Sequence, residues 1–420
     1  MAASAQIQQL HKRLTQAEAD AICARHDRLW QARPGGARAV FAWCDLSGLN
    51  LVGRNLADAD LSGAILADCD LSGARLDSAN LFGADLQNAI LIEASLRRAD
   101  LRGACLRGAD LSGADLFEAD LREGVIAAAD KASGFKVFAA QTRAGEAQGA
   151  ILAGANLQRS KLSGVIAVKA DFSDAVMKDC KLVRANLKQA NLNGADLAGA
   201  DMSGADISGA DLRNAVLVGA RTDQMRKDGA DLQGALTDDA PAGARLTDLP
   251  AAEMLREHAR WCETGGAEGQ PSRFDGVDLR PLKSVKGLNL TALSAKGAVW
   301  YGLDMQGVQL QGAHLEGADL RGCDLRHADL RGARLTGAKL NGSDLRGADL
   351  GPLMITADRL LPTDLTRADL RGADLSGADL RRVVMMLADL SRADFHGARM
   401  DGADTTGAQA RTARGLPPPE

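Results

Sequence analysis

Two histidine–cysteine pairs are the side chains of this sequence whose types best suit metal coordination. They are Cys23 with His26, and His258 with Cys262. Each pair would share one face of a helix, but the two spacings differ, and no other histidine or cysteine cluster accompanies either pair, whereas a zinc site needs three or four ligands. Trp30 follows His26 and Trp261 follows His258 at short spacing. We therefore favour packing of His26 and His258 against these tryptophans over metal binding.

Motifs for other chemistry are missing from the sequence. It contains no GxSxG, no GxxxxGK[ST] and no HExxH. The seven cysteines have no paired spacing. Four of them occupy a repeat position that elsewhere holds alanine, and we interpret these as reduced, small apolar fillers of a cytoplasmic protein: Cys44, Cys69, Cys180 and Cys323. No run of 18 apolar residues is present. We expect no enzymatic activity, no cofactor and no membrane span.

The arrangement that must position every side chain is a five-residue repeat. From Asp58 the chain reads DADLSGAILADCDLSGARLDSANLFGADLQNAI, a unit of the form A-[D/N]-L-x-x with an apolar residue at every fifth position. A period of five fits neither a helix nor a strand, so each unit must combine extended residues with a turn. Alanine and leucine alternate around a polar residue, which predicts that both point inward and the polar residue outward. The frequent Ser-Gly or Arg-Gly pair that follows suits a corner.

This unit resembles the motif of the pentapeptide-repeat family, and the resemblance covers most of the chain. It implies an all-β fold, a right-handed quadrilateral β-helix in which four sides form a coil of about 20 residues. Successive coils then stack at about 4.8 Å. Aromatic residues make up only 3% of the chain, which agrees with an interior too narrow for large rings.

The repeat is interrupted, and the interruptions divide the chain. Residues 13–51 and 245–290 look like two copies of one preface, each with a helix and a Gly-Gly pair ahead of repeats. A helix there would cover the exposed strand edge of a first coil. We predict a helical cap (1–43), repeat block 1 (44–126), an excursion loop (127–149), repeat block 2 (150–220), a linker (221–243), a second helical cap (244–276), repeat block 3 (277–410) and a disordered tail (411–420).

Two further details concern the interruptions. The excursion loop carries Phe135, Val137 and Phe138, large apolar residues that we predict either plug a coil edge or contact a partner protein. The weak stretch 351–364 keeps the phase of the repeat, so we interpret it as a distorted side with a bulge at Pro362.

Aspartates 20 residues apart should stack into columns on the outer faces. One predicted column is Asp60, Asn80, Asp100 and Asp120, and another is Asp329, Asp349, Asp369 and Asp389. Arginines two residues after an aspartate can offset the repulsion within such columns, and they are Arg321, Arg326, Arg331, Arg346 and Arg371. We interpret the columns as solubilising surface, with divalent-ion binding and nucleic-acid mimicry as alternatives.

The leading hypothesis for function is a bacterial, cytoplasmic scaffold or adaptor that binds proteins along its faces. A fainter resemblance, to helix-prefaced repeat proteins among secretion-apparatus genes, implies an accessory role in secretion. The alternative is a DNA mimic that inhibits or protects DNA gyrase, as family members directed at gyrase imply. Those members are more acidic, whereas this chain has a net charge of only −5. We therefore expect protein partners and no direct binding to nucleic acid; the sequence leaves the partner's identity and the oligomeric state open.

Overall fold

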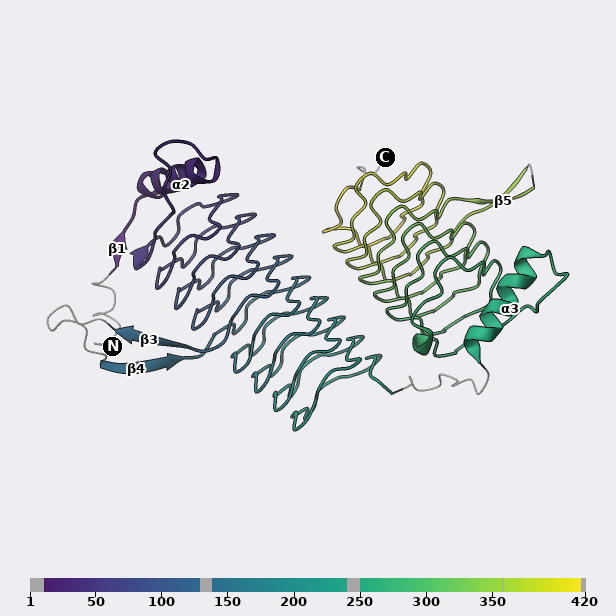
Figure 1. Cartoon of the computed structure of the whole chain (residues 1–420), viewed down its shortest axis with the longest axis horizontal. Helices are drawn as coiled ribbons and strands as arrows, with labels where there is room; N and C mark the ends of the chain where they lie inside the picture. Colours follow the sequence, from purple (N-terminus) through teal and green to yellow (C-terminus); the bar gives the residue numbers. More distant parts are fainter. Residues whose placement is uncertain (1–10, 129–137, 240–249, 357, 417–420) are drawn as a thin grey trace. The chain divides into compact units, whose positions relative to one another are not determined.

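The computed structural model describes residues 11–128, 138–239, 250–356 and 358–416. The chain forms two compact units, Met1–Asp238 and Asp239–Glu420, here called unit 1 and unit 2. Each unit is a stack of coils that begins next to one α-helix (Figure 1). Neither helix is long and apolar enough to cross a membrane, nor is any other helix in the described part of the chain.

Each coil has four sides of five residues. Parallel bridges join residues 20 positions apart, as in Asp60 to Asn80 and Asn80 to Asp100. Leu81 donates its backbone N–H to the carbonyl of Asp100 in the next coil (2.8 Å), and Ala84 donates to Leu81 across a corner (3.0 Å). Because these two bonds recur from coil to coil along both units, the backbone is satisfied without long strands, and the chain forms a β-solenoid.

The interior is filled by the alanine and the leucine of each repeat. Ala84 and Leu86 are fully buried, while Asp85 between them lies on the outside. This confirms the inward and outward positions that the repeat predicts. At the corner that follows Leu71, Gly73 has φ +62°, a backbone conformation that costs glycine little.

Two buried cysteines of the solenoids act as apolar interior residues. Cys69 and Cys323 replace the repeat alanine, are fully buried, and donate their thiols to the carbonyls of Leu46 and Trp300. Burial raises the pKa of Cys69 to about 11 and that of Cys323 to about 12. Neutral thiols at ordinary pH are poor nucleophiles, so these cysteines serve packing.

Unit 1 opens with helix α2 (Gln16–Trp30), which covers the first coil. Thr15 and Glu18 form a capping box at its N-terminus. Strand β1 (Lys12–Arg13) pairs in parallel with β2 (Cys44–Asp45). Gln16 completes the open edge, because its side chain donates to the carbonyl of Asn50 (2.8 Å) and accepts from the N–H of Asn50 (2.9 Å). The cap thus satisfies backbone groups that no preceding coil can pair.

Unit 2 opens in the same way with helix α3 (Ala251–Glu263) and the 3₁₀ turn η1 (Arg280–Leu282). Leu255 and His258 of α3 are buried against the first coils. His258 accepts the backbone N–H of Ser272 at Nδ1 (3.0 Å), so Nε2 carries the proton and donates to the carbonyl of Thr291 (3.1 Å). His258 thereby fixes the helix to both the following loop and the solenoid.

Acid should weaken this second cap. Burial lowers the pKa of His258 below its ordinary value, so the unfolded chain binds a proton that the folded chain resists. The stabilisation is complete above about pH 6.5 and is lost as pH falls through the folded pKa. We expect the Tm of unit 2 to drop between about pH 7.5 and about pH 5.5. A His258→Gln variant should show a smaller drop, and an equal drop would contradict this role.

The first interruption is a β-hairpin inserted into unit 1. Strand β3 (Gly124–Ala128) pairs antiparallel with β4 (Phe138–Arg143). The bridge from Cys105 passes over the insertion to Glu146, a spacing of 41 residues where 20 is usual, so the phase of the repeat shifts by one. The prediction that block 1 extends to Ile126 is therefore wrong. Ile126 lies in β3 because the chain leaves the solenoid after Leu121.

The second interruption is a shorter hairpin in unit 2. Strand β5 (Leu353–Thr356) pairs antiparallel with β6 (Arg359–Leu361) and projects from the coils (Figure 1). The bridge from Arg334 reaches Asp364, a spacing of 30, so the insertion of ten residues preserves the phase. The predicted distorted side with a bulge at Pro362 is therefore wrong, since ten extra residues leave the solenoid altogether.

Thr363 forms hydrogen bonds with the preceding coil at the point where this hairpin returns to the solenoid. It is fully buried at the position of a repeat alanine, and its hydroxyl accepts the N–H of Gly332 (2.9 Å) and donates to the carbonyl of Leu330 (3.1 Å). The N–H of Gly332 would otherwise lose its partner, because the hairpin displaces the corner that normally stacks there, whereas the carbonyl of Leu330 also accepts the N–H of Ala333 (3.0 Å).

Removal of the hairpin tests this account of the phase. Deleting residues 353–362 leaves Leu350 and Leu365 five positions apart, as in an uninterrupted repeat. We expect the variant to fold with the same circular dichroism spectrum and a Tm within a few degrees of the parent. A matched deletion of 353–360 would leave seven positions between the leucines and should lower the Tm more. Unfolding of the first variant would show that the hairpin is structural.

Two predicted boundaries also need correction. Bridges reach Arg226, Asp231 and Leu236, so coils extend through most of the segment predicted as a linker at 221–243. The repeat tolerates polar residues there because this coil is the last of the stack. Among the described residues of unit 1, no further coil packs on its outer end. In unit 2 the bridges reach Arg414, so part of the predicted tail at 411–420 belongs to the last coil.

Candidate interaction surface

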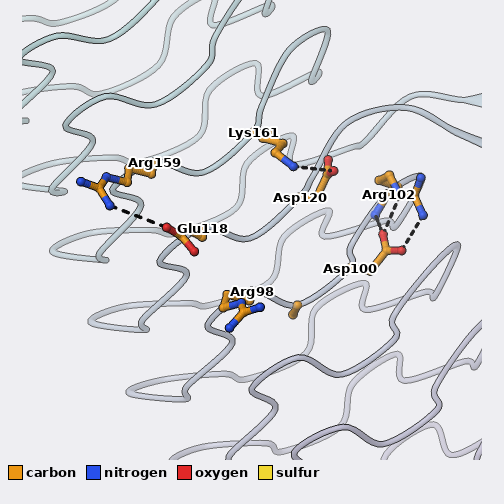
Figure 2. A pocket seen from close by; sticks show the side chains of 8 residues that line it. Arg98, Asp100, Arg102, Glu118, Asp120, Arg159 and Lys161 are labelled. Atoms are coloured by element: carbon orange, nitrogen blue, oxygen red, sulfur yellow. Dashed lines mark hydrogen bonds and ion pairs between the residues drawn. The ribbon is translucent and has the colours of Figure 1, made fainter.

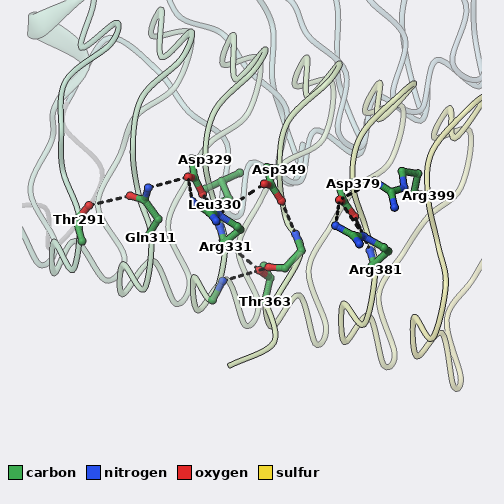
Figure 3. Close-up of polar contacts among 12 residues, drawn as sticks. Thr291, Gln311, Asp329, Leu330, Arg331, Asp349, Thr363, Asp379, Arg381 and Arg399 are labelled. Atoms are coloured by element: carbon green, nitrogen blue, oxygen red, sulfur yellow. Dashed lines mark hydrogen bonds and ion pairs between the residues drawn. The ribbon is translucent and has the colours of Figure 1, made fainter. Parts of the chain in front are cut away.

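The outer faces carry a recurring ion pair between an aspartate and the arginine two residues later, here called a clip. In repeats that read Asp-Leu-Arg, the carboxylate of the aspartate accepts the backbone N–H and two guanidinium N–H groups of the arginine. Asp379 and Arg381 show the geometry, with contacts of 2.8 Å to Nε and 2.6 Å to Nη2 (Figure 3). Such paired bonds hold an otherwise flexible arginine in one orientation.

The clips at Asp379 and Asp324 lower the proton affinity of these two carboxylates. The hydrogen bond from Arg381 lowers the pKa of Asp379, and the bond from Arg326 does the same for Asp324. Both aspartates are therefore ionised at neutral pH, and each is paired with the positive charge of an adjacent arginine. These faces are highly charged but locally balanced.

Further contacts connect one coil with the next. The guanidinium of Arg331 binds Asp329 of its own repeat (2.6 Å) and reaches Asp349 of the next coil (3.6 Å). On the other side, Gln311 donates to Asp329 (2.7 Å) and accepts the hydroxyl proton of Thr291 (2.7 Å) (Figure 3). These contacts offset the repulsion between stacked carboxylates.

The structure corrects one of the two predicted columns. Asp60, Asn80, Asp100 and Asp120 stack as predicted. The column Asp329, Asp349, Asp369 and Asp389 does not form, because the hairpin insertion adds ten residues after Asp349. Asp349 instead bridges Asp379, while Asp369 lies between Lys339 and Asp389.

The charges of the first column change sign along unit 1. After Asp120 the column continues with Lys161 and Lys181, which stack one coil apart. At this change lies an open depression of about 480 Å³ (Figure 2). Its charged side chains alternate in sign, with Arg159 3.7 Å from Glu118 and Lys161 3.7 Å from Asp120. Shallow and polar, the depression suits contact with a protein surface better than enclosure of a small molecule.

Comparison with known families identifies the fold. The model of the family described as pentapeptide repeats matches eight copies that together span more than half of the chain, at residues 38–81, 79–116, 147–179, 180–219, 287–326, 304–342, 313–351 and 363–407. The chain belongs to this family. The pentapeptide-repeat matches stop on both sides of the two hairpins, which agrees with their place outside the solenoids.

Solved pentapeptide-repeat structures resemble this chain in part. QnrB1, described as a plasmid-mediated fluoroquinolone resistance protein, is 19% identical over 47% of this chain and 88% of its own, with a TM-score of 0.34. Rfr23 from the cyanobacterium Cyanothece is 26% identical over 33% and 91%, with a TM-score of 0.27. HetL from the cyanobacterium Nostoc, described as involved in heterocyst differentiation regulation, is 24% identical over 91% and 93%, with a TM-score of 0.19. A search of curated proteins found none that matches.

The predicted cap residues of this pentapeptide-repeat protein form one histidine–tryptophan pair in each unit. His26 is buried, accepts the N–H of Ala39 at Nδ1 (3.0 Å), and its ring lies edge-on to Trp30 at 6.3 Å. The rings of His258 and Trp261 are 5.8 Å apart. Within the described ranges no group of three or more possible metal ligands occurs. The contacts that His26 and His258 make are those of structural histidines.

The predicted partner contacts are not placed by the structure. Phe135 and Val137 lie outside the described residues, and Phe138 is described only as the first residue of β4. Their role in binding stays a prediction.

The exposed apolar side chains of unit 2 were not predicted from the sequence. Met354 is 68% exposed and Ile355 49%, both on the β5–β6 hairpin, and Leu387 on a nearby corner is 51% exposed. A signal was present, because residues 383–387 read VVMML where the repeat would place polar residues at three of five positions.

Proposed function

We propose that this chain is a non-enzymatic scaffold or adaptor that binds other proteins along the outer faces of two right-handed, four-sided solenoids. The observation that carries the proposal is the filled interior. Alanine and leucine occupy successive interior positions with almost no exposure, so a ligand can bind only on the outside. A long and rigid outer surface is what repeat proteins use to bind partners.

The surface offers different chemistry at different places, which suits more than one partner. Unit 1 has the mixed-charge depression at Arg159 and Lys161, and unit 2 has the exposed apolar hairpin. We propose protein partners, a bacterial cytoplasm as the compartment and, as a narrower version, an accessory role beside a secretion apparatus. Phe135, Val137 and Phe138 are proposed as a further contact.

Cross-linking in cells followed by mass spectrometry tests the proposal. We expect a small set of partner proteins whose cross-links map to outward lysines, including Lys161 and Lys181. A variant with Phe135→Ser, Val137→Ser and Phe138→Ser should lose one partner if the excursion is a contact. Recovery of the same background proteins with this chain and with an unrelated repeat protein would contradict a scaffold role.

Mimicry of DNA is the alternative, and the column Asp304, Asp324, Asp344, Asp374 and Asp394 favours it. Five stacked carboxylates form a regular line of negative charge. Arg326 and Arg346 clip onto Asp324 and Asp344, however, so much of that charge is neutralised. A supercoiling assay with purified DNA gyrase separates the two functions: a mimic should inhibit the enzyme or protect it, and a scaffold should leave it unchanged.

A further inference from the structure

The apolar side chains of unit 2 border one side of the solenoid. Hairpin β5–β6 returns at Thr363, directly before Asp364, and Asp364 bridges Val384 in the next coil. Met386 (37% exposed) and Leu387 follow Val384 toward the far corner of that side. The point where the hairpin returns and the corner at Leu387 therefore lie at opposite edges of the same face, one coil apart along the stack.

The hairpin is held with one apolar face outward. Leu353 and Leu361 pair across the strands and pack on the corner at Gly332, where an added Cβ would lie 2.8 Å from Leu353. Met354 and Leu360 form the next cross-strand pair and are 68% and 39% exposed. Because the half-buried pair Leu353 and Leu361 fixes the base of the hairpin, the exposed pair is presented in a fixed orientation rather than on a free loop.

Three exposed arginines that form no ion pair among the described residues lie near these apolar residues. Arg367 donates its backbone N–H to the carbonyl of Met386 (2.8 Å), which places Arg367 one coil before Met386 and Leu387. Arg382 lies at the corner directly ahead of Val383, and Arg359 lies on the hairpin. All three arginines are exposed, and none forms an ion pair among the described residues, unlike the clipped arginines of the same unit.

These apolar side chains, and the arginines around them that form no ion pair among the described residues, indicate which kind of ligand the surface would bind. The Met386 surface comprises Met354, Leu360, Met386, Leu387, Arg359, Arg367 and Arg382. A complementary segment needs apolar side chains for the centre and carboxylates for the rim. We propose that the Met386 surface binds an acidic amphipathic segment of a partner protein, which deepens and rests on the proposed scaffold function.

A pair of peptides tests the proposal on the full chain. The probe is a fluorescein-labelled helix-forming peptide with leucines at i, i+3, i+4 and i+7 and glutamates elsewhere, and its control carries lysine in place of glutamate. Fluorescence anisotropy should give a Kd for the acidic peptide below about 100 µM and binding of the lysine peptide at least about tenfold weaker. Failure of the acidic peptide to bind, or equal binding of the two peptides, would overturn the proposal.

Variants locate the binding. The double variant Met354→Ser and Leu360→Ser should weaken the acidic peptide by about tenfold, as should Met386→Ser with Leu387→Ser. Arg367→Glu with Arg382→Glu should reverse the preference toward the lysine peptide. The matched control, Ile90→Ser with Ile151→Ser, removes exposed isoleucines of unit 1 and should leave both affinities unchanged.

The outcomes also separate this surface from the proposed function. Unchanged peptide affinities in all the unit 2 variants would contradict binding at the Met386 surface. Partner cross-links at other places on the chain would then still support a scaffold. Selective peptide binding without any cellular partner would support the surface chemistry and contradict the scaffold role.

Discussion

Replacing Leu187 with alanine should lower the free energy of unfolding of unit 1 by about 2–5 kcal/mol. Leu187 is fully buried at the centre of a side and stacks between Ala167 and Ile207 of the adjacent coils. Backbone hydrogen bonds between the coils hold these neighbours in place, so the cavity cannot collapse. Replacing Ala185 with leucine should cost about 1–3 kcal/mol for the opposite reason, because the position has no room for a larger side chain. Denaturant unfolding followed by circular dichroism measures both changes.

The residue between them is the matched control. Asn186 lies on the outer face of the same side, so Asn186→Ala should change the free energy of unfolding by less than about 0.5 kcal/mol. A larger loss from Asn186→Ala than from Leu187→Ala would contradict the assignment of inward and outward positions.

Unit 2 should fold without unit 1. A fragment of residues 239–420 contains its own cap α3, a continuous apolar core from Leu255 to Phe395, and the backbone bridges of all its coils. We expect a β-rich circular dichroism spectrum and one cooperative thermal transition, because each coil depends only on its neighbours.

A shorter fragment tests the role of the cap. Residues 265–420 lack α3 and with it the contacts of His258 to Ser272 and Thr291. This fragment should melt at a lower temperature and aggregate more readily, since its first coil then exposes an unpaired edge. A gradual, non-cooperative transition of the longer fragment would contradict the division of the chain into two units.

Much of the fold could be predicted from residue spacing. A strict period of five forces leucine and alanine inward, and the two prefaces, each with a Gly-Gly pair ahead of the repeats, predicted α2 and α3. The stacking of Asp60 on Asn80 followed from the same period, because no insertion separates them. These predictions succeeded because they depend on local geometry that each repeat imposes by itself.

The exposed surface could not be predicted in the same way. The sequence indicated that 351–364 departs from the repeat, but Met354 and Leu360 are exposed only because Leu353 and Leu361 take the places against Gly332. Which apolar residue of a hairpin packs against the solenoid depends on the corner beneath it, and that corner is distant in the sequence.

By itself the sequence determined the solenoid, its inward and outward positions, its caps and the division into two units, because the period and the capping signals act over a few residues. Only the tertiary structure decided which residues stack. An insertion of 21 residues shifts the phase and an insertion of ten keeps it, yet both change the coil that a given aspartate meets. Asp349 therefore contacts the coil of Asp379 and not that of Asp369, since hydrogen bonds between coils form with the chain that returns to the stack.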